Sequence, residues 1–128
     1  MEITCPSTGM YAAVSMLNTI CVRGTVSGTA EEPGAPTALP TTIRVRVVSG
    51  HIVPPPPTAE PVQTGDVDVM PLGTDWSASV PVPGSSPTGE PLTVVAWEKV
   101  GSGSWGPPLS EQFYGGGPNP TDCCAGSP

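Results

Sequence analysis

Short runs in which apolar and polar residues alternate recur from Ile20 to Val100, separated by turns rich in glycine and proline. Strict alternation over about four to eight residues is typical of a β-strand with one buried face. A similar run returns near the end of the chain, before a glycine-rich stretch. The sequence therefore predicts six strands: Ile20–Ser27, Thr42–Val48, Asp66–Met70, Asp75–Val82, Leu92–Val100 and Leu109–Tyr114.

The segment Asp75–Val82 has the most regular alternation, and it places Trp76 on the face that points into the core. Gly24 lies inside the first strand, where the missing side chain leaves room for a large neighbour. We expect Trp76 to fill that space. Pro81 cannot donate a hydrogen bond to a neighbouring strand, so we expect it at a sheet edge or where its strand leaves the sheet.

Two other strands differ in how their polar residues are arranged. In Thr42–Val48, Arg44 and Arg46 alternate with isoleucine and valine, so we expect both arginines on a solvated face. In Leu92–Val100 both faces are apolar, which predicts a central strand covered on both sides. Gly50–Pro61 contains four consecutive prolines and is predicted to be a stiff polyproline crossover between two sheets.

Three phrases of this region resemble the small bacterial immunoglobulin-like domains of cell surfaces and phage particles: Gly24-x-Val26-x-Gly28, Trp76-Ser77-Ala78-Ser79-Val80 and Gly89-x-x-Leu92-x-Val94-x-Ala96. The resemblance covers Thr19–Tyr114. It implies an all-β fold, an Ig-like Greek-key β-sandwich of about seven to eight strands, here with long Pro/Gly-rich loops. The family serves as a spacer, an adhesion module or a decoration of capsids and tails, and it supplies no catalytic residues.

The chain on either side of residues 19–114 has no counterpart in that pattern. Residues 1–18 are rich in apolar side chains, and we expect them to add a strand to a sheet edge of this chain or of a neighbouring one. Met10–Leu17 fits either a strand or a short helix. Residues 115–128 form a tail that needs a disulfide or a neighbouring subunit to hold it. The candidate interface residues are Met10, Tyr11, Val14, Leu17 and Trp105.

The four cysteines, Cys5, Cys21, Cys123 and Cys124, lack the short spacing of zinc ligands. Their even number permits two disulfides, for instance one from each of the two terminal cysteines to Cys5 and Cys21. Such bonds would tie both tails to the sandwich and are typical of small domains in oxidising surroundings. Free thiols in a reducing compartment are the alternative, and metal binding ranks last.

Four basic residues face eleven acidic ones, which gives a net charge of −7. This balance excludes nucleic acid as the expected partner, because nucleic-acid binding requires clustered lysine and arginine. It also disfavours an anionic membrane surface, and no apolar run is long enough to insert into a membrane. The first residues lack the basic region of a secretory signal. We therefore expect a virion-associated or other extracellular protein, with a cytoplasmic location as the alternative.

Candidate catalytic or metal-binding residues are sparse. His51 is the single histidine, and no spacing points to a serine and a carboxylate that would complete a triad with it. Asp66, Asp68 and Asp75 are weak candidates for a cation site, since the glycine and glutamate of a calcium loop are missing. Gly101–Gly106 has the spacing of a dinucleotide-binding loop but opens no helix. We predict no cofactor.

These observations favour a non-enzymatic structural or interaction module that self-associates or docks on a larger assembly. An assembly or decoration subunit of an extracellular or phage-like particle or filament is the leading hypothesis. A secreted adhesion or carbohydrate-binding domain, with Trp97 and Trp105 as exposed stacking platforms, is the alternative. A small hydrolase or a metal-binding protein ranks last.

Overall fold

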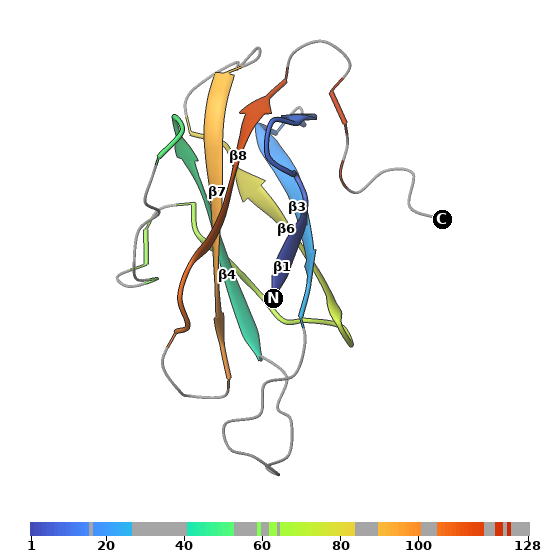
Figure 1. Cartoon of the computed structure of the whole chain (residues 1–128), viewed down its shortest axis with the longest axis vertical. Coiled ribbons are helices and arrows are strands. Elements are labelled where there is room, and N and C mark those ends of the chain that lie inside the picture. Colours follow the sequence, from blue (N-terminus) through green and yellow to red (C-terminus); the bar gives the residue numbers. More distant parts are fainter. Residues whose placement is uncertain are drawn as a thin grey trace.

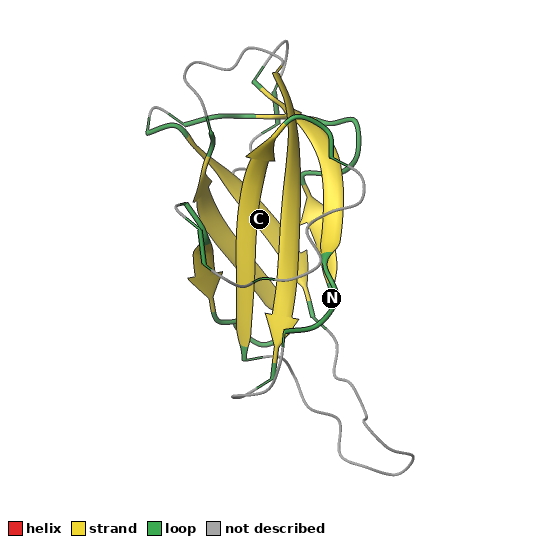
Figure 2. Ribbon diagram, turned by 90° about the vertical axis from the view of Figure 1, so that its left-hand side faces the viewer, coloured by secondary structure: helices red, strands yellow, loops and turns green. Residues whose placement is uncertain are grey.

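The computed structural model describes residues 1–15, 17–26, 41–52, 59, 62–63, 65–83, 90–100, 105–116, 120–121 and 123. This part of the chain forms two β-sheets and contains no helix (Figure 2). One sheet has the order β1 (Glu2–Cys5), β3 (Thr19–Thr25) and β6 (Asp75–Pro81). The other has the order β2 (Tyr11–Ala12), β8 (Leu109–Gly115), β7 (Glu90–Lys99), β4 (Thr42–Ser49) and β5 (Val67–Val69). Figure 1 shows β4 and β7 in one layer and β3 and β6 in the other.

All six strands predicted from the alternation are present, with ends shifted by at most two residues. The alternation is reliable here because burial follows it closely. Every second side chain of β6 is buried, and the side chains between them are exposed. The inner faces of both sheets supply one apolar cluster, built mainly from valine, isoleucine and leucine with Trp76 and Phe113.

Trp76 lies in this core with 3% of its surface exposed, directly opposite Gly24 in the β3–β6 register. A Cβ atom at position 24 would overlap the Trp76 ring and the backbone oxygen of Glu2. The expectation that Gly24 makes room for Trp76 is confirmed. Pro81 ends β6, which is an edge strand of its sheet, also as expected.

The strand β7 is central in its sheet and buried on both faces, as its composition predicts. Its outer face packs Val95 and Trp97 against Ala59, which is fully buried, with Trp105 at the margin of this cluster. Ala59 belongs to the connection between β4 and β5, which are neighbours in one sheet. The prediction of an inter-sheet crossover is therefore wrong: at Ala59 this connection covers the outer face of the sheet. The proline run itself lies outside the described residues.

The N-terminal segment supplies two short strands that pair within the chain, and no helix forms between Met10 and Ser15. The strand β1 runs antiparallel to β3, whereas β2 runs parallel to β8 in the other sheet. Thr121 pairs in turn with the outer side of β2, through backbone hydrogen bonds to Tyr11 and Ala13. A disulfide joins Cys5 to Cys123, and Cys21 is also disulfide-bonded. Cys124 lies outside the described residues.

Candidate interaction surfaces

The outer face of the five-stranded sheet carries two arginine–aspartate pairs that link β4 to the chain around β5. Arg46 Nε and Nη2 donate to the two carboxylate oxygens of Asp66 at 2.7 and 2.8 Å. Arg44 binds Asp68 in the same bidentate manner, at 2.8 and 3.0 Å. The side chains of Arg46 and Asp66 are 6% and 0% exposed. The expectation that both arginines are solvated is therefore wrong, because each is covered by neighbouring chain and paired with a carboxylate.

Each of these two arginines lies over the ring of a tryptophan. The guanidinium carbon of Arg46 is 4.8 Å from the centre of the Trp97 ring, and that of Arg44 is 4.6 Å from the Trp105 ring. Lys99 Nζ also lies 4.7 Å from the Trp105 ring. Such geometry is attractive because the ring face carries negative charge. Trp97 is fully buried, and Trp105 is half-buried beside two cations. The hypothesis that these rings are exposed stacking platforms is wrong for Trp97, and the ring of Trp105 is already occupied by cations.

The three aspartates considered as cation ligands do not come together. Burial alone would raise the pKa of Asp66, but the hydrogen bonds from Arg46 and from the Gln63 N–H outweigh it and lower that pKa. Asp68 is bound to its own arginine, and Asp75 lies at the start of β6 in the other sheet. No group of three potential metal ligands occurs in the described part of the chain.

The candidate interface of the N-terminal segment is divided between buried and exposed residues. Val14 packs against the core, and Met10 Sδ lies 3.7 Å from Cys5 Sγ. Tyr11 is 37% exposed and stacks on Tyr114 of β8 with ring centres 5.1 Å apart. Leu17 is 86% exposed in the turn before β3. Tyr11 and Leu17 therefore remain accessible to another molecule.

His51 lies beside Tyr114. Its Nε2 is 2.9 Å from the carbonyl oxygen of Phe113, and its ring meets Tyr114 edge-on. The exposed loop position expected for this histidine agrees with the structure.

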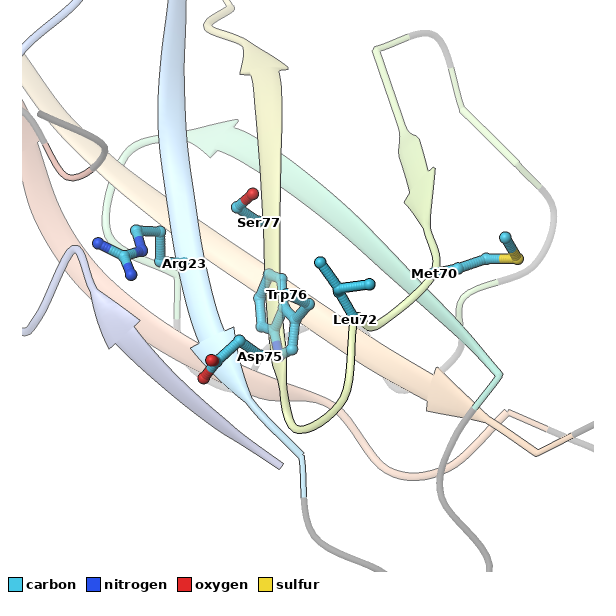
Figure 3. A pocket seen from close by; sticks show the side chains of 6 residues that line it. All are labelled: Arg23, Met70, Leu72, Asp75, Trp76 and Ser77. Carbon is cyan, nitrogen blue, oxygen red and sulfur yellow. The ribbon is translucent and has the colours of Figure 1, made fainter. Parts of the chain in front are cut away.

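The connection between β5 and β6 exposes two large apolar side chains that the alternation pattern does not predict. Met70 is 79% and Leu72 is 88% exposed. Figure 3 shows Leu72 beside β6 and Met70 pointing away from it. They help to line a cavity of about 230 Å³, together with Arg23, Asp75, Trp76 and Ser77. The sequence feature that could have predicted this exposure is Met70-Pro71-Leu72-Gly73, in which two large apolar residues stand within a proline- and glycine-containing turn.

Comparisons with protein-family models, with curated proteins and with solved structures find no match to this chain. In the described residues there is no helix long and apolar enough to cross a membrane.

Proposed function

We propose that this protein is a non-enzymatic, Ig-like interaction module that serves as an assembly or decoration subunit of an extracellular or phage-like particle. The observation that carries the proposal is the exposed apolar turn between β5 and β6. Burying one such side chain in an interface is worth about 1.5–3 kcal/mol. Met70 and Leu72 together therefore offer a protein partner enough apolar surface to form a small, well-defined contact.

The order of the strands supports the Ig-like part of the proposal. Immunoglobulin domains keep strands A, B and E in one sheet and strands G, F and C in the other, with C′ beside C in variable-type domains. Assigning β1, β3 and β6 to A, B and E reproduces the first sheet. Assigning β8, β7, β4 and β5 to G, F, C and C′ reproduces the second. The additional parallel strand β2 fixes the N-terminal segment beside β8.

The disulfide supports an extracellular setting. Disulfides persist in oxidising surroundings and are rare in reducing ones. The Cys5–Cys123 bond ties the N-terminal segment to the C-terminal tail, and Cys21 is disulfide-bonded as well. A domain displayed on a particle gains resistance to unfolding from such links.

A secreted adhesion domain that binds carbohydrate is the second candidate. The stacked rings of Tyr11 and Tyr114 favour it, because a partly exposed aromatic ring presents an apolar face with a polar tip. This pair takes the place of Trp97 and Trp105 as the candidate stacking surface.

The test compares immobilised wild-type protein with the double variant Met70→Ser, Leu72→Ser. Both are exposed to the particle and extracellular fractions of the source culture. We expect the wild type to retain a specific protein, and the double variant to lose that retention by at least about tenfold, since two apolar contacts are removed. Val62→Ser is the control, because it removes an exposed apolar side chain that is not among the candidate interface residues. Equal retention by all three proteins would contradict the proposal.

A further inference from the structure

The hydrogen bonds at the two ends of the β3–β6 pair define which backbone groups of β6 face away from its sheet. Val26 N–H donates to the Thr74 carbonyl at 2.8 Å, and Val82 N–H donates to the Asn18 carbonyl at 2.9 Å. In an antiparallel pair, hydrogen-bonded residues alternate with non-hydrogen-bonded ones. The register between these two ends is unbroken. The backbone groups that point toward β3 are therefore those of Trp76, Ala78 and Val80, and those that point outward belong to Asp75, Ser77, Ser79 and Pro81.

The outward backbone groups are hydrogen-bonded at one end of β6 but have no backbone partner in its middle. Asp75 exchanges backbone hydrogen bonds with Leu72, at 2.8 and 3.2 Å, so Leu72 takes the place of a neighbouring strand there. The outward N–H and C=O groups of Ser77 and Ser79 have no backbone partner within the described part of the chain. Pro81 offers a carbonyl and no N–H.

We propose that this open stretch of β6 pairs with β6 of a second copy of the chain, antiparallel and about a two-fold axis at Ser79. A two-fold contact must be self-complementary. The exposed side chains on the outer face of β6 after Asp75 are Ser77, Ser79 and Pro81, which carry no charge and would not repel their copies. The inference rests on the proposed function and names the partner as a second copy.

The position of Leu72 selects the register. Centring the pair on Ala78 would bring the partner's Pro81, which is still within its strand, into the place that Leu72 occupies. Centring it on Ser79 brings the partner's Pro83 there instead, where the chain has left β6 and bends. In that register Ser79 exchanges hydrogen bonds with the partner's Ser79. Ser77 N–H donates to the carbonyl of the partner's Pro81, whereas the Ser77 carbonyl faces a proline without an N–H and stays hydrated.

The exposed apolar turn fits the same arrangement. Leu72 would lie against the partner's Pro83, so an apolar side chain that is now 88% exposed would be covered at each end of the interface. A single pair of strand edges is smaller than the roughly 1,200–2,000 Å² of a stable interface. We therefore expect a concentration-dependent equilibrium between monomer and dimer, strengthened when many copies share one assembly.

The test uses the full-length oxidised protein at about 0.15 M ionic strength, where long-range repulsion between the acidic subunits is screened. Light scattering should give a mass that rises from 12.9 kDa toward twice that value as the concentration increases to about 1 mM. Ser79→Lys and Ser79→Glu each place like charges opposite one another across the axis, so each should weaken the dimer by up to about fivefold. An equimolar mixture of the two variants should regain a dimer.

Ser77→Lys is the matched control, since the partner residue opposite it is Pro81 and its own copy is distant. It should leave the dimer intact. Ser79→Pro removes an outward N–H without breaking a bond to β3, and it should give a folded monomer. A wild type that stays monomeric to about 1 mM, a mixture that does not recover, or equal loss with Ser77→Lys would each overturn the proposal. A monomer that still retains a particle protein through Met70 and Leu72 would overturn the dimer and leave the proposed function standing.

Discussion

The buried pair of Arg46 and Asp66 should contribute far more to folding than the neighbouring pair of Arg44 and Asp68. Asp66→Asn keeps the shape of the side chain but removes its charge and turns one acceptor into a donor. Arg46 would then lose the carboxylate that neutralises it, in a site where its side chain is 6% exposed. Removing one partner of a buried ion pair costs about 3–5 kcal/mol. That is a large share of the roughly 5–15 kcal/mol that stabilises an ordinary domain.

Asp68→Asn is the matched control, because the Arg44–Asp68 pair has the same bidentate geometry as the Arg46–Asp66 pair but is more exposed. The Asp68 side chain is 44% exposed, and exposed pairs contribute about 0–1 kcal/mol. Urea unfolding followed by tryptophan fluorescence should give a midpoint that falls strongly for Asp66→Asn and little for Asp68→Asn. In thermal melts the buried variant should lose roughly 10–20 °C. Equal losses from the two variants would refute the reasoning that burial decides the contribution of each pair.

Three further predictions concern acid, the core and the disulfide. The pKa of Asp66 is lower in the folded protein than in the unfolded chain. Its contribution to the free energy of unfolding is therefore present above about pH 4 and is lost as the pH falls through the folded pKa. Urea titrations at several pH values should show that the stability difference between wild type and Asp66→Asn narrows in acid. Trp76→Ala should cost about 3–5 kcal/mol and Trp105→Ala clearly less, since Trp76 is 3% exposed and Trp105 only half-buried; similar losses in the same titration would contradict this assignment. Replacing Cys5 and Cys123 together by serine should lower stability by about 2–5 kcal/mol, because the bond closes a loop of 118 residues; an unchanged midpoint in urea would argue against it.

The strands could be predicted because their alternation records burial directly. In β6 each apolar side chain points inward and each polar one outward, so the sequence alone places Trp76 correctly. The same reasoning fails for Arg46. Its polarity predicts exposure, but its carboxylate partner comes from a separate segment, twenty residues away along the chain, and covers it. Alternation within one strand contains no information about which distant side chain will pair with a given residue of that strand.

The candidate interaction surface was harder to predict for a related reason. Met70 and Leu72 are apolar, and apolarity normally predicts burial, yet the turn between β5 and β6 holds both outside the core. The outward direction of the Ser77 and Ser79 backbone groups depends on the hydrogen-bonding phase between β3 and β6. That phase is fixed by pairing across the sheet, and no residue type in β6 reveals it.

The bond between Cys5 and Cys123 also has a mechanical consequence. Extending the chain between these two cysteines, which are 118 positions apart, would lengthen it by up to roughly 400 Å if the bond were absent. With the bond intact, tension applied to the chain outside the two cysteines passes through the sulfur atoms, and of the strands only β1 has residues, 2–4, outside the closed loop. Under load the closed loop therefore behaves as a link of nearly fixed length, and the strands within it keep their arrangement until the disulfide is reduced.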